Sequence, residues 1–259
     1  PTGKTLTAGG RSTRMLERLR KMIGGGATPP PDTAASAAKS APVAHHAAVP
    51  VVTPDLVAWT REHGIFLGRS DTGRALTLSG VDGQTAWRGE IGASNRDFIH
   101  GAELRLRAEL GLDPGVFVLV INRPLRATLE RMAYSQFTDS LQTSVDSSLT
   151  EELRWLAMYE EKGWADLPDA FVERYAILAR DAGEARAYVS DELIACMTGW
   201  PSPPMTAEHA LMLIVQRGKA YLRMEYLPEP IEVLQHALRT HAVLCHAARA
   251  AAAKPDLSL

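Results

Sequence analysis

The feature that most limits what this chain can fold into is a low-complexity stretch at residues 27–50. It reads ATPPPDTAASAAKSAPVAHHAAVP and consists mainly of Ala, Pro and Ser. Such a segment has too few large apolar side chains to build a core, and its prolines favour extended backbone. We therefore predict a disordered tether at 27–50. It separates a short leader, residues 1–26, from a folded body, residues 51–259.

The leader and the body differ in charge. Residues 1–50 contain seven Lys or Arg and two acidic residues, a net +5, and because the whole chain carries −2, residues 51–259 carry −7. Different partners are expected for parts of opposite charge. Residues 51–131 contain ten Arg but also ten Asp or Glu, so the body is not a basic platform and nucleic acid is not an expected partner.

Residues 12–23 of the leader have the pattern of a short amphipathic helix. Ser12 is a suitable N-cap, and three glycines follow Ile23. Apolar side chains fall on one stripe and basic ones on the other side. The residues that we expect to contact a partner are Arg14, Leu16, Leu19 and Met22. Twelve residues are too few for a stable isolated helix. The segment could become ordered on a protein partner, or, as the weaker alternative, on a membrane surface. The third alternative is that it stays a frayed, solvated tail.

The body has the composition of an ordinary globular chain. Hydrophobic residues make up 46% of the sequence and charged residues 22%. The longest apolar runs, such as residues 116–121, are too short to cross a bilayer, and the first residues lack the pattern of a secretory signal. The cytoplasm of a bacterial cell is the expected compartment, and the oligomeric state is open.

Local signals predict an α+β body. Thr53 and Pro54 are typical of a helix start, and glycine-containing turns near residues 71–73 and 82–83 indicate antiparallel strands. The expected order is a helix at 54–63, three strands within 65–91, a helix at 101–111, a buried strand at 116–122, a helix from Pro124, a helical insertion at about 145–205 with one helix near 166–178, a hairpin within 210–226 and a long C-terminal helix from 231.

This order of elements is loosely similar to that of the small two-layer chaperones that escort effectors in bacterial type III secretion. The similarity covers element order alone and no residue motif supports it, and the insertion at 145–205 departs from it. The resemblance implies an α+β fold and a chaperone-like role in binding other proteins.

No metal site or cofactor is predicted. His241 and Cys245 lie one helical turn apart, but they stand among Leu234, Leu238 and Ala248 and share their face with no further ligand. We expect both side chains to belong to the core. The second cysteine, Cys196, lies in another helical stretch, so no disulfide framework is indicated.

Residues 87–103 form the densest polar stretch of the chain. It contains Arg88, Glu90, Arg96, Asp97, His100 and Glu103, which could supply acid, base and anion-binding groups. A solvated loop and strand end with Arg–carboxylate pairs is the plainer interpretation, because such pairs are common on surfaces.

Two hypotheses about function follow. The sequence favours a non-enzymatic protein-binding or adaptor module in which the flexible tether raises the local concentration of the leader to the millimolar range. The leader could also lie on the acidic body and be displaced by a partner. The alternative is an enzyme with catalytic residues Glu90, Asp97 and His100 that holds an anionic substrate through Arg88 and Arg96. That alternative requires the three catalytic side chains to converge in a concave pocket.

Overall fold

The structure is a computed structural model that describes residues 50–139, 150–201, 209–226 and 230–253. The predicted leader and residues 27–49 of the predicted tether lie outside the described residues. The chain divides into two compact units, one of residues 37–125 and 161–259 and the other of residues 1–36 and 126–160. The first unit contains almost all of the β-sheet, and the second contains most of helix α3 (Arg123–Asp139) and helix α4 (Glu151–Met158).

The body begins with helix α2 (Pro54–Glu62), as its capping signal predicts. The Thr53 side chain accepts a hydrogen bond from the Leu56 amide at 3.2 Å, and Pro54 occupies the first turn. Strands β1 (Phe66–Arg69), β2 (Leu76–Asp82) and β3 (Thr85–Ala93) follow. The β2–β3 turn contains Gly83 at φ +58°, a conformation that suits glycine.

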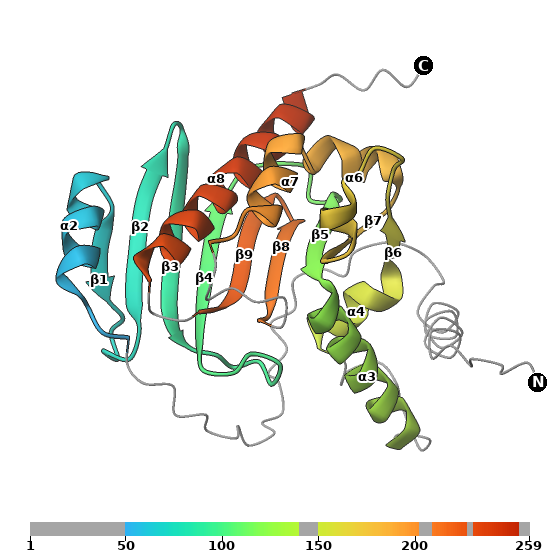
Figure 1. Ribbon diagram of the computed structural model, residues 1–259, viewed down its shortest axis with the longest axis horizontal. Helices are drawn as coiled ribbons and strands as arrows, with labels where there is room; N and C mark the ends of the chain where they lie inside the picture. The colour runs from blue at the N-terminus through green and yellow to red at the C-terminus, as the bar shows by residue number, and fades with distance from the viewer. Residues whose placement is uncertain (1–49, 140–149, 202–208, 227–229, 254–259) are drawn as a thin grey trace, which may run out of the picture. The chain divides into compact units, whose positions relative to one another are not determined.

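Nine strands of the described residues form one sheet, in the order β1-β2-β3-β4-β9-β8-β5-β7-β6 (Figure 1). The remaining strands are β4 (Ala102–Glu109), β5 (Phe117–Asn122), β6 (Glu160–Lys162), β7 (Tyr175–Ala179), β8 (Leu211–Gln216) and β9 (Lys219–Tyr226). The pairs from β1 through to β7 are antiparallel. At the middle of the sheet β4 pairs with β9, so an early and a late part of the chain meet there.

The helix predicted at residues 101–111 is wrong, because this segment is strand β4. Leu104 and Leu106 are fully buried while Arg105 and Arg107 on the other face stay partly exposed. This alternation of apolar and polar side chains suits a strand that is buried on one face. Pairing with strands on both sides therefore outweighs the helix propensity of Ala, Glu, Leu and Arg.

The insertion predicted as helical at 145–205 is helical only in part. It contains α4, the one-turn helix α5 (Asp169–Val172), α6 (Ala182–Tyr188) and α7 (Asp191–Thr198), but also strands β6 and β7. The helix predicted near 166–178 is wrong beyond residue 172, since Tyr175–Ala179 is a strand with every residue buried. A strand that is buried on both faces has no alternation by which the sequence could reveal it.

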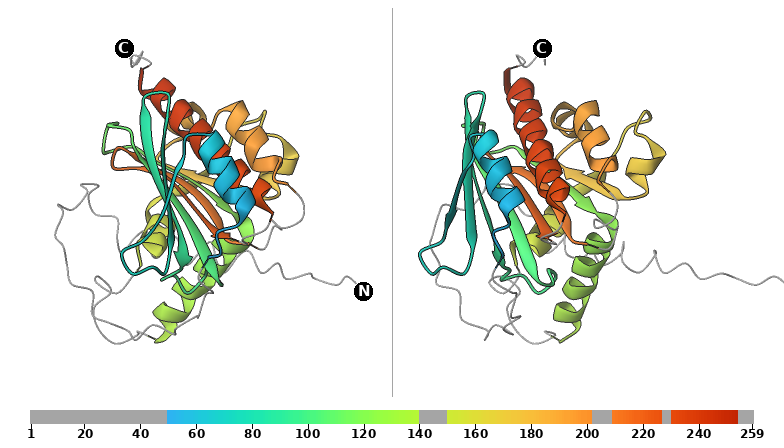
Figure 2. Two further views of the ribbon diagram at one scale, coloured as in Figure 1. Left: turned by 90° about the vertical axis from the view of Figure 1, so that its left-hand side faces the viewer. Right: turned by 60° about the vertical axis from the view of Figure 1, so that its left-hand side comes forward.

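Helices cover one face of the sheet. The C-terminal helix α8 (Ile231–Ala253) crosses it and buries Val233, Leu234 and Ala237 in the main core. Helices α2 and α8 lie on the same side of β1, β2 and β3, with α2 near the sheet edge (Figures 1 and 2). The antiparallel sheet, its helical layer and the long C-terminal helix confirm the predicted α+β class.

Candidate binding site between α2 and α8

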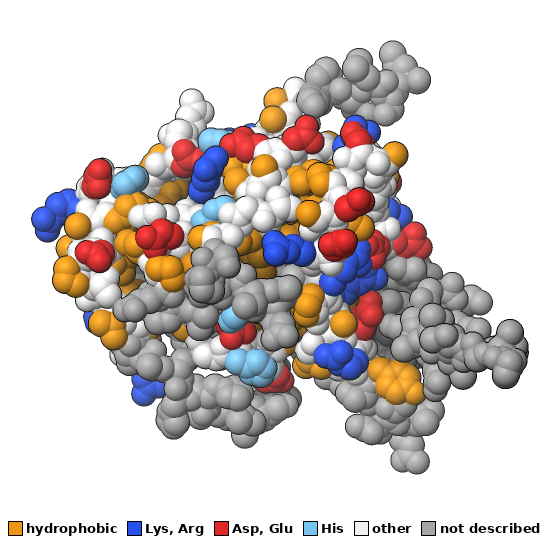
Figure 3. Space-filling view, viewed as in Figure 1, with side chains coloured by type: hydrophobic (Ala, Val, Ile, Leu, Met, Phe, Trp, Pro, Cys, Tyr) orange, Lys and Arg blue, Asp and Glu red, His pale blue; other side chains and the backbone are white. Residues whose placement is uncertain are grey.

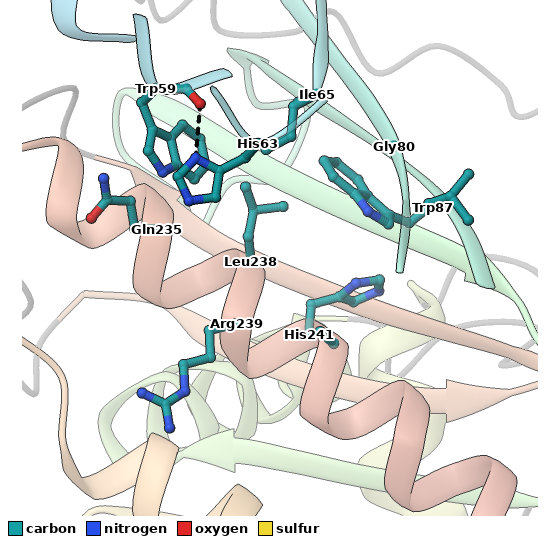
Figure 4. Close-up of a pocket in the computed structure, with 11 residues that line it drawn as sticks. Trp59, His63, Ile65, Gly80, Trp87, Gln235, Leu238, Arg239 and His241 are labelled. Carbon is teal, nitrogen blue, oxygen red and sulfur yellow. Dashed lines mark hydrogen bonds between the residues drawn. The ribbon is translucent and has the colours of Figure 1, made fainter. Parts of the chain in front are cut away.

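A groove separates helices α2 and α8 above strands β2 and β3 (Figure 4). Its hollow has a volume of about 350 Å³. Trp59 is on α2, and His63 is the residue that caps the end of this helix. Leu238 and His241 come from α8, and Trp87 comes from β3. The size lies within the range of pockets that hold small ligands or single protein side chains.

The groove is apolar along most of its length. Trp59, Trp87 and Leu238 are only partly buried, so each presents hydrophobic surface to the hollow. Trp87 lies against Gly80 on the neighbouring strand, where a Cβ atom would approach the indole ring to 2.9 Å. A side chain at position 80 would therefore displace the indole from this position. The space-filling view shows hydrophobic side chains at the surface around α2 and along α8, interspersed with charged ones (Figure 3).

A second hollow of about 370 Å³ lies at the start of the same two helices. Leu56 of α2 and Ile231 of α8 line it, Tyr226 contributes from β9, and the carboxylates of Asp55 and Glu232 stand at its sides. Because both hollows lie between α2 and α8, an apolar segment could contact the two helices over more than one turn.

A third hollow, of about 470 Å³, is larger but its polar groups are already used by the protein. Arg123 donates to the Val172 carbonyl and, at 2.7 Å, to Glu161, and the Tyr175 hydroxyl donates to the Met197 carbonyl at 2.9 Å. Burial raises the pKa of Tyr175 to about 12, so this phenol stays protonated. These contacts indicate that Arg123 and Tyr175 have a structural role. We therefore favour the α2–α8 groove as the candidate binding site.

His241 closes the inner end of the groove and belongs to the core, as predicted. Its Nε2 hydrogen is directed at the Ala220 carbonyl at 3.4 Å, and the Cys245 sulfur lies 3.9 Å from the same nitrogen. Burial lowers the pKa of His241 to about 4, although the Ala220 carbonyl and Asp82 act in the opposite direction. Burial also raises the pKa of Cys245 to about 12, so a neutral imidazole lies beside an unreactive thiol.

This burial predicts how stability depends on pH. The folded protein holds the pKa of His241 at about 4 and an unfolded histidine titrates near 6.5, so the unfolded chain binds the extra proton between these values. The contribution of His241 to the free energy of unfolding is therefore fully present above pH 6.5. It decreases as the pH falls toward 4, with a limiting slope of about 1.4 kcal/mol per pH unit. Thermal melts of the wild type and His241→Gln across this range test it. Identical profiles for the two proteins would contradict this account of His241.

Apart from Trp87, the polar stretch at 87–103 lies outside the groove, partly on the sheet face opposite α8. Glu90 and Glu103 both interact with Arg105, at 2.7 Å and 3.8 Å, and Glu103 also accepts from Arg223 at 3.2 Å. Ser94 donates to Glu103 at 2.9 Å and accepts from the Arg96 amide at 3.0 Å, which fixes the start of the β3–β4 loop. Glu103 is completely buried within this network, which we name the Glu103 network.

The structure does not link the three proposed catalytic residues by a hydrogen bond or ion pair within its described part. Glu90 is on β3 with Arg105, whereas Asp97 and His100 are exposed in the loop between β3 and β4. None of the three hollows described above includes any of them. Arg96 is half-buried in the same loop, and Arg88 is exposed on β3.

The predicted leader contacts Arg14, Leu16, Leu19 and Met22 lie outside the described residues, so the docking helix stays a prediction. The α2–α8 groove was missed by sequence reasoning. Trp59 and Leu238 each lie on predicted helices, and their large apolar side chains were a signal for a contact surface. The sequence does not show that these two helices lie apart above the same strands.

Comparisons with protein-family models, with curated proteins and with solved structures gave no match for this chain. Among the described residues, no helix is both long enough and apolar enough to cross a bilayer. The same residues contain no group of three His, Cys, Asp or Glu side chains placed to hold a metal ion.

Proposed function

We propose that this chain is a non-enzymatic protein-binding module of the adaptor or chaperone-like kind, which holds an apolar segment of a partner protein between α2 and α8. The observation that carries the proposal is the open apolar groove with Trp59, Trp87 and Leu238 at its surface. Large aromatic and aliphatic side chains around a preformed hollow are the usual anchors of protein interfaces.

The polar groups of the groove support binding rather than catalysis. The His63 ring donates through Nδ1 to the Trp59 carbonyl at 3.0 Å, and His241 is buried with its pKa well below the ordinary value. Arg239 points away from the other labelled side chains (Figure 4). The lining therefore presents surface for an apolar side chain rather than an acid and a base aimed at one point.

The leader completes the proposed module. Its stripe at Leu16 and Leu19 would form a second contact with the partner, and the tether at 27–50 would keep the two contacts in one complex. The enzymatic alternative at Glu90, Asp97 and His100 receives less support, because Glu90 is bound to Arg105 on the strand face.

Binding of a partner to groove and leader variants tests the proposal. Proteins captured from native lysate by the full chain are identified, purified and titrated against Leu238→Asp, Leu16→Asp/Leu19→Asp, and Phe66→Asp as a control. Phe66 is 70% exposed and lies outside the groove. We expect the Leu238 and leader variants to weaken the complex at least tenfold, which is about 1.4 kcal/mol, and the Phe66 variant to leave it unchanged.

Two further results decide the outcome. Circular dichroism must show that Leu238→Asp is folded, and Trp59→Ser on the opposite helix provides an independent groove variant. Unchanged affinity in both groove variants would overturn the proposed site, and unchanged affinity in the leader variant would remove the leader from the module.

A further inference from the structure

Four polar side chains form a row across the sheet face opposite α8. The strand registers place Ser79 beside Arg88, Arg88 beside Arg107, and Arg107 beside Tyr221. Directly paired residues of neighbouring strands point to the same face and lie about 5 Å apart. Strands β2, β3, β4 and β9 therefore bring two hydroxyls and two guanidinium groups into one line.

The positive charge of this row is only partly neutralised. Arg88 has no hydrogen bond or ion pair with any residue that the structure describes. Arg107 pairs with Glu109 through Nη2, but its Nε is shielded from solvent and has no hydrogen-bond partner within the described residues. Like charges directly opposite each other in a sheet are destabilising, so this arrangement favours an anion between them.

The neighbouring arginines on the same face differ in this respect. Arg105 is held by Glu90 and Glu103, and Arg223 is held by Glu103. Two arginines of this face are thus bound by the Glu103 network. Arg88 has no partner among the described residues, and Arg107 has one ion pair and an Nε without a hydrogen-bond partner.

Within the described residues, side chains at the β1–β3 end of this sheet face are exposed. Phe66, in the same row on β1, is 70% exposed. Helices α2 and α8 both lie on the other side of these strands (Figure 2). A small molecule can therefore reach Arg88 and the exposed part of the Arg107 side chain, which is 37% exposed.

We propose that Ser79, Arg88, Arg107 and Tyr221 form a binding site for the phosphate group of a small molecule. A phosphate presents several oxygens in a tetrahedron and can accept from two guanidinium groups and a hydroxyl at once, whereas a carboxylate is planar and suits one guanidinium. Glu90 and Glu109 lie two residues along the strands from Arg88 and Arg107, and their charges oppose an extended polyanion such as nucleic acid.

This site is independent of the α2–α8 groove, which lies on the other side of the sheet. Loss of partner binding in Leu238→Asp and loss of phosphate binding in Arg88→Gln therefore report on different surfaces, so either proposal can fail alone.

The test is isothermal titration of the full chain with inorganic pyrophosphate at low ionic strength, with acetate as the carboxylate comparison. We expect saturable binding of one pyrophosphate, no saturable binding of acetate, and affinities about tenfold lower for Arg88→Gln and for Arg107→Gln. Arg74→Gln is the matched control, since Arg74 is an exposed arginine in the turn before β2, and its affinity should equal that of the wild type.

Thermal melts establish that each variant is folded, which is expected because Arg88 is exposed and the Arg107 side chain is 37% exposed. Absence of saturable pyrophosphate binding by the wild type overturns the proposal. An equal loss of affinity in all three arginine variants overturns it as well, because that result means diffuse attraction to the surface charge.

Discussion

Replacing Glu103 by glutamine is expected to lower the free energy of unfolding by roughly 3 kcal/mol. The Glu103 side chain is completely buried, and its carboxylate lies within 3.2 Å of Arg223 and 3.8 Å of Arg105. Glutamine keeps the size of the side chain but removes the negative charge, so Arg223 and Arg105 each lose their ion pair with Glu103, while Arg105 keeps the one with Glu90. Urea denaturation followed by circular dichroism measures the loss.

Glu90→Gln is the matched control for this prediction. Glu90 is bound to the same Arg105 at 2.7 Å, but its side chain is 42% exposed. Water screens this pair, so we expect a loss below about 1 kcal/mol. Equal losses in the two variants would show that burial does not strengthen the Glu103 interactions.

Replacing Gly218 by alanine is the second substitution with a large expected effect, roughly 3 kcal/mol. Gly218 has φ +73° in the β8–β9 turn, and a Cβ atom there would lie 2.8 Å from the Leu112 carbonyl oxygen. The strained backbone accounts for about 1 kcal/mol, and displacement of the Leu112 backbone accounts for the rest. The shift in the urea midpoint measures the effect.

Gly83→Ala separates the two contributions. Gly83 has φ +58° in the β2–β3 turn, and its added Cβ would meet nothing within 4 Å. We expect this variant to lose only about 1 kcal/mol, the part due to backbone conformation. If Gly218→Ala lowers the free energy of unfolding no more than Gly83→Ala does, the contact with Leu112 does not contribute to the effect.

Elements defined by local signals were predictable from the sequence. Thr53 and Pro54 mark the start of α2, and the turns at Gly73 and Gly83 separate β1, β2 and β3, because a cap or a turn depends on a few adjacent residues. Strand β4 was missed for the opposite reason. Its conformation depends on pairing with β9, and Glu103 meets Arg223 across a sequence separation of 120 residues.

The polar candidates were predictable as residues but not as an arrangement. Glu90 and Glu103 both interact with Arg105, and they can do so only because β3 and β4 pair in the observed register. Arg223 could not be assigned to the same cluster, since nothing in the sequence places β9 beside β4. The α2–α8 groove shows the same limit, because its walls come from three separate segments of the chain.

The pairing of β4 with β9 also bears on synthesis of the protein. While the ribosome is translating residues before Lys219, β4 has β3 on one side and no partner on the other. A nascent chain at that stage presents an unpaired strand edge beside the buried leucines of β4, which favours association with other chains. Completion of the sheet must therefore wait for β9, the last strand to be synthesised among the described residues.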